Sequence, residues 1–367
     1  MNDHITHSLR RHINIFAIYR TLLCCLAAAS IAIASAFWLS EILSPQSMES
    51  RIVKGQSLIC LPDTLREDEE MEPMTEGSLK KEIYITQPDT DNKEAPAENI
   101  GIFPITEIDM SNGAEPGEVM VRDSDSGLNV DVQKLLHSPY PPALKEDDFS
   151  KVNTTSPPLV LILHTHATES YADNGVTTYT SDTSFRSEDS EKNVVAVGKV
   201  MADTLNSKGI NTLHCTILHD KDDYNGAYDN SLATVKRYLN EYPSIKYVFD
   251  IHRDAMIRET GEALKPVCNI EGRQTAQIMT LVGTDAGGAA HPDWQNNNMN
   301  LAVKLQSRLT AEYNGMARPI NTRRLSFHQQ YAPGSLLFEI GSCANTLEEA
   351  KAAAACLAEA IADTIRN

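Results

Sequence analysis

The sequence has little positive charge and no paired cysteine motif, and each of these absences excludes a class of function. Its 367 residues include 32 lysines and arginines against 50 aspartates and glutamates, so the formal net charge is -18. A partner bound through phosphates calls for a basic face, so we do not expect a nucleic-acid partner. The seven cysteines form no C-x-x-C pair, which argues against a zinc site built from thiolates. No internal repeat is present.

Charged residues are also missing from one apolar stretch near the N-terminus. Residues 21–39 (TLLCCLAAASIAIASAFWL) are enough to cross a bilayer core of about 30 Å as a helix. Three arginines precede this stretch and Glu41 is the next charged residue after it, so the positive-inside rule predicts a cytoplasmic N-terminus and an extracytoplasmic remainder. The alternative is a signal peptide cleaved after the small residues that end at Ala36. In both cases the chain is exported.

Composition divides the chain into four segments. A cytoplasmic N-terminus at 1–20 and a transmembrane helix at 21–39 precede an acidic extracytoplasmic linker at 40–155. The linker is rich in Asp, Glu, Pro, Ser, Thr and Gly, which is typical of a solvated tether, although short apolar runs such as 100–105 predict partial order. A folded domain is expected at 156–367.

Strand-like and helix-like patterns alternate along that domain. Residues 159–163 (LVLIL) form an unbroken apolar run, typical of a strand buried on both faces. Apolar residues recur at helical spacing over 193–208, and Gly209 stands where this helix should end. The alternation predicts an α/β fold, in which a mixed, mostly parallel sheet is flanked by helices on both faces. Further strands are expected near 210–217, 246–251, 278–282 and 336–340, and further helices near 230–241, 296–313 and 347–365.

Chemically active side chains follow three of the expected strands. HTHATE at 164–169 comes directly after the first strand, DIHRD at 250–254 ends another, and Glu339 lies near the end of a third. Ligands of open α/β sheets bind beyond the carboxyl ends of the strands. We therefore expect these three motifs, distant in sequence, to meet at one edge of the sheet.

Two of the motifs contain residue types that bind zinc. His166 and Glu169 form an H-x-x-E pattern, and an imidazole and a carboxylate at this spacing suit one ion. His252 is the predicted third ligand, and water takes the fourth position. His164 is the alternate imidazole, since either or both histidines can face the metal from an extended segment. If only His166 binds, His164 is expected to orient a ligand or contact substrate. Glu191, just before the next expected helix, is a rival second ligand, or else an acid favoured by the helix dipole.

A further carboxylate has to hold the attacking water and pass its proton to the leaving amine. Glu339 is the candidate, because apolar neighbours on a buried strand raise the pKa of an acid. Arg253 and Asp254, next to His252, are expected either to fix the site through hydrogen bonds or to form a surface pair. The residues thus predict zinc-dependent hydrolysis of an amide.

Five motifs make the sequence resemble the stage II sporulation protein P family. They are HTHATESY at 164–171, NVVAVG at 193–198, YNGAYDNS at 224–231, DIHRDA at 250–255 and SLLFEIGSCANTLEEA at 335–350. They occur in the family's order and span nearly all of the expected domain. The domain is similar in turn to zinc-dependent N-acetylmuramoyl-L-alanine amidases, whose catalytic Glu comes just before a G-x-x-x-N turn. Glu339 stands in that position before the turn from Gly341 to Asn345, so Asn345 is expected to support the site.

The resemblance implies a membrane-anchored peptidoglycan hydrolase that acts in sporulation and engulfment. It assigns the catalytic role to Glu339 and a metal role to His252. The broader amidases favour a second ligand placed like Glu191, whereas the sporulation family shares the acid of HTHATE, Glu169, which we prefer. The resemblance also implies cleavage of both the amide between glycan and stem peptide and a peptide cross-link. The implied partners are stage II sporulation protein D, a wall hydrolase, and stage II sporulation protein M, a membrane protein.

Two other interpretations fit the same residues. An H-x-x-E pattern with a distant histidine also describes zinc carboxypeptidases, which trim the end of a peptide chain. A wall-binding scaffold without activity would keep the fold and lose only the chemistry. Product analysis separates the first from an amidase, and bound zinc together with substitution of Glu339 separates the second.

Overall fold

The structure is a computed structural model that describes residues 100–139 and 157–366. The expected cytoplasmic segment at 1–20, the expected transmembrane helix at 21–39 and most of the expected linker lie outside these residues. None of the helices within the described ranges has the length and apolar character of a membrane span. The described residues all belong to one compact unit.

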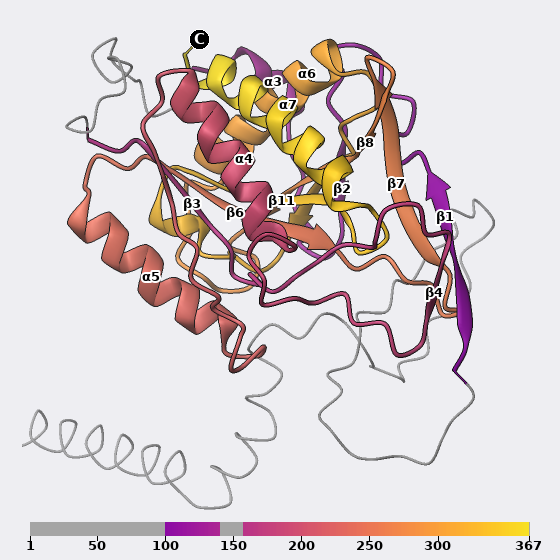
Figure 1. Ribbon diagram of the computed structural model, residues 1–367. Helices are drawn as coiled ribbons and strands as arrows, with labels where there is room; N and C mark the ends of the chain where they lie inside the picture. The colour runs from indigo at the N-terminus through magenta and orange to yellow at the C-terminus, as the bar shows by residue number, and fades with distance from the viewer. Residues whose placement is uncertain (1–99, 140–156, 367) are drawn as a thin grey trace, which may run out of the picture. The chain divides into compact units, whose positions relative to one another are not determined.

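A seven-stranded sheet forms the centre of the fold (Figure 1). All neighbouring strands in it are parallel except β9 and β11, which are antiparallel. The predicted α/β fold with a mixed, mostly parallel sheet is therefore confirmed. In spatial order the strands are β2 (Val121–Asp123), β10 (Ile320–Arg323), β9 (Ile278–Gly283), β11 (Gly334–Ser342), β6 (Tyr247–Asp254), β3 (Val160–Leu163) and β5 (Thr212–His214).

The antiparallel pair reverses the direction of one half of the sheet. Ile340, near the end of β11, pairs with Ile278 at the start of β9. β10 runs parallel to β9, so both strands begin at the edge where β3, β6 and β11 end. Residues that precede β9 and β10 can therefore reach the edge at which the sequence motifs are expected to meet.

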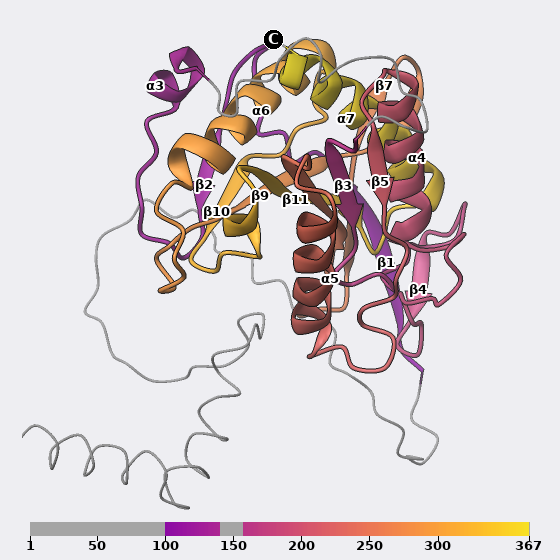
Figure 2. The ribbon, with the colours of Figure 1, turned by 90° about the vertical axis from the view of Figure 1, so that its left-hand side faces the viewer.

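Helices cover both faces of the sheet, as Figures 1 and 2 show. The alternating side chains of β3 explain the two layers. Val160 and Ile162 join the larger hydrophobic core with residues of α4 (Val194–Ser207), α6 (Asn300–Glu312) and α7 (Leu347–Arg366). Leu161 and Leu163 join a second core with Val235 of α5 (Ala227–Glu241). All four β3 side chains are buried, as the unbroken apolar run predicts.

The helix α4 begins and ends with local sequence signals. The side chain of Asn193 accepts a hydrogen bond from the N–H of Val195 at 2.9 Å and so caps the first turn. Gly209 has a φ of 81° two residues after the helix ends, a backbone conformation that favours glycine. The expected end of this helix at Gly209 is therefore confirmed. A π-helical turn, η2 (Gln295–Met299), leads into α6, and a 3-10 turn, η3 (Gln329–Tyr331), precedes β11.

A second sheet adds four strands in the order β4 (Thr178–Thr180), β1 (Ile102–Ile108), β7 (Ala263–Ile270) and β8 (Arg273–Ala276). The apolar run at 100–105 thus leads into β1. Residues 100–139 of the expected linker also contribute β2 and the short helix α3 (Val132–His137) to the fold. β7 contains Pro266 and β8 is mostly polar, so no apolar alternation predicts these two strands.

Candidate active site

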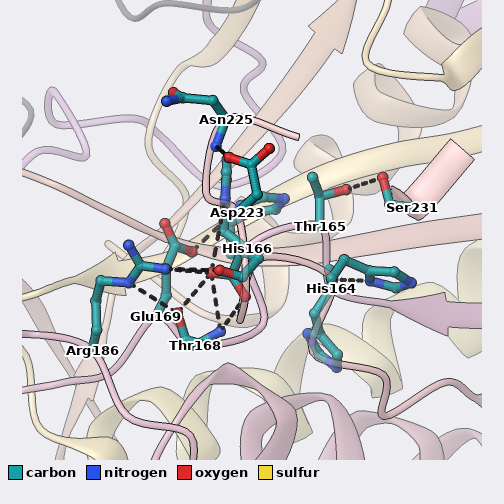
Figure 3. A network of polar contacts seen from close by, with 12 residues as sticks. His164, Thr165, His166, Thr168, Glu169, Arg186, Asp223, Asn225 and Ser231 are labelled. Atoms are coloured by element: carbon teal, nitrogen blue, oxygen red, sulfur yellow. Dashed lines mark hydrogen bonds and ion pairs between the residues drawn. The ribbon is translucent and has the colours of Figure 1, made fainter. Parts of the chain in front are cut away.

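The loop that carries HTHATE follows β3 and is held by side chains from other segments (Figure 3). Thr165 donates its N–H and its hydroxyl to the carboxylate of Asp250, at 2.8 and 2.6 Å. Thr168 donates its N–H and hydroxyl to Asp220, at 3.0 and 2.7 Å. Arg186 lies 3.3 Å from the same Asp220 carboxylate. The two threonines between the metal-binding residue types therefore fix the shape of the loop.

His164 is turned toward the helix α4. Its Nδ1 lies 3.0 Å from the carbonyl oxygen of Ile251, and its Nε2 lies 2.9 Å from Nε2 of His214. A carbonyl only accepts, so Nδ1 of His164 carries the proton and His214 donates to Nε2. Gly198 leaves room for the ring, since a Cβ there would lie 2.5 Å from Cε1 of His164. Both ring nitrogens of His164 are thus engaged away from His166.

His166 lies beside His252, with ring centroids 5.5 Å apart. The ring of His166 also stacks on the ring of Tyr224, with centroids 4.2 Å apart. The Nδ1 atom of His166 is buried and has no hydrogen-bond partner among the described residues, although Asp220 lies 3.9 Å away. Burial lowers the pKa of His166 to about 4, so the imidazole is neutral at neutral pH, which is the form that binds metals.

His252 lies between two buried carboxylates. Its Nδ1 is 3.4 Å from Oε2 of Glu169. Its Nε2 is 3.0 Å from Oδ1 of Asp250, but off the direction of a hydrogen bond. Burial opposes the charged form of His252, and these two carboxylates outweigh that effect and raise its pKa. Burial also raises the pKa of Glu169, but Arg253 and His252 outweigh it and hold that pKa at about 2.

Two histidines and a glutamate form a donor set that suits zinc, and the separations of these donors agree with it. Two ligand atoms bound at about 2.0–2.1 Å to a tetrahedral ion lie about 3.4 Å apart, and His252 Nδ1 and Glu169 Oε2 are separated by 3.4 Å. Two imidazoles on such an ion have ring centroids about 5 Å apart, close to the value for His166 and His252. No three His, Cys, Asp or Glu side chains in residues 100–139 and 157–366 converge enough to hold an ion as they stand. Binding would therefore have to draw the donors together, and zinc stays a prediction.

Glu339 lies on β11 directly across from His252 on β6. Its Oε2 atom is buried and has no hydrogen-bond partner among the described residues. Burial, followed by the charge of Asp254, raises the pKa of Glu339 to about 8. A carboxyl group with such a pKa can both hold and release a proton near neutral pH.

The residues that flank His252 have separate partners. Arg253 is buried and donates from Nε to the carbonyl of Ser170 at 3.1 Å and from Nη2 to the carbonyl of Phe185 at 2.9 Å. It thereby ties β6 to the chain after HTHATE. Asp254 accepts a hydrogen bond from Arg318 at 2.8 Å. This pair was expected either to support the site or to form a surface pair. Arg253 fits the supporting role, since it is buried and hydrogen-bonded.

Asn345 supports the backbone that follows Glu339. Its Oδ1 accepts from the N–H of Ser342 at 2.8 Å, and its Nδ2 donates to Glu349 at 3.0 Å. Gly341 has a φ of 71°, and a Cβ there would lie 2.8 Å from Oδ1 of Asn345. The pairing of β11 with β6 shifts register at this turn, between Glu339 and Ser342. The G-x-x-x-N turn thus ends regular strand pairing just beyond the candidate catalytic residue.

Glu191 is not brought to this group. Its side chain is exposed, and its N–H donates to Asp189 at 3.0 Å in the turn before α4. Glu169 is 7% exposed and adjoins His252. The structure therefore gathers His166, Glu169, His252 and Glu339 at one edge, and leaves Glu191 on the surface.

A family model for stage II sporulation protein P matches residues 64–362. The chain belongs to this family. A curated member, stage II sporulation protein P of Bacillus subtilis (strain 168), is 27% identical over an alignment of 229 residues that covers 59% of this chain and 54% of that protein. The match thus spans about half the length of the curated relative.

Solved structures of amidases are also similar. An N-acetylmuramoyl-L-alanine amidase of Nostoc punctiforme, AmiC2, is 14% identical with a TM-score of 0.31, over 57% of this chain and 95% of that one. The CwlD amidase of Clostridioides difficile, in complex with the GerS lipoprotein, is 14% identical with a TM-score of 0.34, over 57% and 96%.

The site of this stage II sporulation protein P family member includes residues for which no role was predicted from the sequence, and one of them, Asp250, lies within the DIHRD motif. Asp250 stands two residues before His252, and this spacing on a strand places both on one face. That spacing was a usable signal, since metal-binding histidines commonly pair with a carboxylate. Asp220 and Arg186 have no local sequence signal, because their partners in HTHATE are distant in the chain.

Proposed function

We propose that the chain is a membrane-anchored, zinc-dependent peptidoglycan hydrolase of the N-acetylmuramoyl-L-alanine amidase type, with endopeptidase cleavage of a peptide cross-link as a second activity. One observation carries the proposal. His166, Glu169 and His252 meet beside Glu339, and two of these donors are spaced like ligands of one tetrahedral ion. Membership of the stage II sporulation protein P family supports a role in sporulation.

His166, Glu169 and His252 would hold the ion. When bound, zinc supplies a Lewis acid for an amide carbonyl and lowers the pKa of a water molecule to near neutrality. Asp250 lies 3.0 Å from Nε2 of His252, on the side of the ring away from Glu169. A small rotation would let it accept the N–H of that nitrogen and hold the ring in place.

Glu339 is the proposed proton carrier. Its carboxylate removes a proton from the attacking water and delivers it to the leaving amide nitrogen, while the carbon–nitrogen bond breaks and a carbon–oxygen bond forms. The products are one carboxylic acid and one amine. The position of Glu339 across from His252 and its pKa of about 8 both support this role.

The proposal extends to where the enzyme acts. Residues 21–39 would form a single membrane helix with a cytoplasmic N-terminus, supported by their lack of charge. A tether raises the local concentration of an enzyme next to a fixed polymer such as the cell wall. Stage II sporulation proteins D and M are the proposed partners in engulfment, supported by family membership.

Digestion of purified wall fragments by the full zinc-loaded chain tests the reaction, with mass spectrometry of the products. An amidase releases whole stem peptides and leaves glycan without them. Loss of terminal residues from stems that stay attached to glycan would assign a carboxypeptidase instead. Binding to the fragments without any product would assign a scaffold.

A further inference from the structure

Arg318 reaches the candidate site from the segment just before β10, a strand that runs opposite to β6 and β11. Its N–H donates to the carbonyl of Ile278 at 2.8 Å, and its own carbonyl accepts from Gln306 at 2.7 Å. These bonds fix its backbone at the start of β9, just before β10. Because of the reversal in the sheet, this is the edge at which Glu339 and Asp254 lie.

One nitrogen of the Arg318 guanidinium group lacks a hydrogen-bond partner among the residues that the structure describes. The side chain is 5% exposed, and Nη2 donates to Oδ2 of Asp254 at 2.8 Å. The Nη1 atom is buried and finds no hydrogen-bond partner in the described part of the chain. Arginine stays charged in proteins, so it cannot relieve an unpaired N–H by losing a proton. Leaving such a donor buried without an acceptor is unfavourable.

Glu339 also has a polar atom without a partner, since its buried Oε2 has no hydrogen-bond partner within the described residues. The charges of Asp254 and Arg318 both act on this carboxyl group, so the three side chains occupy one neighbourhood. That neighbourhood therefore contains one unused donor, on Arg318, and one unused acceptor, on Glu339.

A peptide unit offers both missing partners, since its carbonyl accepts and its N–H donates. Asp254 already neutralises the charge of Arg318, so a neutral carbonyl oxygen suits Nη1 better than a second carboxylate. We propose that Arg318 is a substrate-binding residue whose Nη1 donates to a carbonyl oxygen of the stem peptide, beside the amide that Glu339 serves. This inference rests on the proposed peptidoglycan hydrolase activity and assigns it a peptide-binding contact.

An alternative role for Arg318 is support of Asp254 alone. A supporting arginine would affect folding and zinc binding, but would not set the affinity for substrate. A lysine at position 318 keeps the ion pair with Asp254 and removes the second donor arm. Arg318→Lys therefore separates the two roles, and Arg308→Lys is the matched control, because Arg308 pairs with Glu312 on the surface of α6 at 2.7 Å.

The experiment measures kcat and KM of the full zinc-loaded chain on a soluble disaccharide that bears a stem peptide. We expect Arg318→Lys to raise KM by about tenfold or more, the loss that goes with one charge-assisted hydrogen bond. Its zinc content and thermal midpoint should match those of Arg308→Lys, whose KM should equal the wild-type value. Added guanidinium ion should restore part of the kcat/KM lost in Arg318→Ala.

An unchanged KM in Arg318→Lys would overturn the inference while leaving the hydrolase activity of the wild type intact. Loss of zinc in Arg318→Lys, with no rescue of Arg318→Ala by guanidinium, would overturn it in favour of a supporting role. Arg318→Lys could also raise KM only for stem peptides with free side-chain carboxyls, and not for stem peptides with amidated ones. That result would overturn the carbonyl assignment in favour of a carboxylate. If the wild-type chain releases no stem peptide, the proposed function fails, and this inference fails with it.

Discussion

The Nδ1 atom of His252 lies 3.4 Å from the Oε2 atom of Glu169, a separation that fits two ligands of one zinc ion. The two residues come from different strands, since His252 lies within β6 and Glu169 on the loop after β3. Parallel pairing of β3 with β6 brings them together. The candidate metal site is thus a product of the sheet topology, and its parts can be tested one at a time.

Removal of a proposed ligand should remove the metal. We expect His252→Ala and Glu169→Ala to lose bound zinc, because each change takes away one of three protein donors. Zinc measured per chain after dialysis checks this result. His137→Ala, at an exposed position on α3, is the control and should keep its zinc. Zinc loss in Glu191→Ala with retention in Glu169→Ala would contradict the ligand assignment.

Asp250 should matter through the ring of His252. We expect Asp250→Asn to weaken zinc binding by roughly 10- to 100-fold, because the carboxylate that orients the imidazole is lost. Competition with a chelator of known affinity measures the change. Asp203→Asn, on the exposed side of α4 where Asp203 pairs with Lys199, should leave zinc affinity as it is. Equal affinities for the two variants would remove Asp250 from the site.

Gly198 should be required for the packing of His164. Alanine normally stabilises a helix by about 0.5–1 kcal/mol relative to glycine. Here the new Cβ would lie 2.5 Å from Cε1 of the buried His164 ring, so we expect Gly198→Ala to lower the free energy of unfolding by about 1–3 kcal/mol. Urea denaturation measures it.

A double-mutant cycle provides the control for that prediction. The cost of Gly198→Ala should shrink when His164→Ala is already present, since the clash then has no partner. A Gly198→Ala variant as stable as the wild type would show that the ring of His164 does not pack there.

Glu339 should make the stability of the zinc-free protein depend on pH. Its pKa rises from 4.5 to about 8 in the folded chain, mainly through burial, so the folded state binds this proton more tightly than the unfolded state. The resulting stabilisation is complete below about pH 4.5 and is lost as the pH rises to about 8. Relative to the wild type, Glu339→Gln should therefore gain stability over this interval.

Urea denaturation of both proteins at a series of pH values tests that difference. Glu348→Gln, at an exposed position on α7, is the control and should follow the wild type. Parallel curves for wild type and Glu339→Gln between about pH 5 and pH 8 would contradict the raised pKa.

Much of the fold could be predicted from the sequence, because its central strands are apolar and its helices carry apolar residues at regular spacing. The strands that carry Glu339 and His252, and the helix that begins after Asn193, all appear near their expected positions. The strands β7 and β8 could not be predicted from the sequence, since they bury only part of their side chains and so lack a regular apolar pattern. β8 pairs with β7, and β7 in turn pairs with β1, which lies far away in the chain.

Only part of the candidate site could be predicted from the sequence, because the sequence does not show the direction in which a loop or a strand runs. Periodicity could not say which of His164 and His166 faces His252, because the loop bends after β3. Its path is fixed by hydrogen bonds that its N–H groups donate to Asp250 and Asp220. Arg318 could not be predicted as a site residue for another reason. The rule that sites lie at carboxyl ends of strands does not apply to it, since β9 and β10 run in the opposite direction.

The most direct test of the proposed function compares the wild type with Glu339→Gln on purified peptidoglycan, both loaded with zinc. The measurement is the release of stem peptides from glycan, with bound zinc quantified in the same samples. We expect release by the wild type, none by Glu339→Gln, and equal zinc in both proteins. Equal release by the two proteins would contradict the role of Glu339 and with it the proposed reaction.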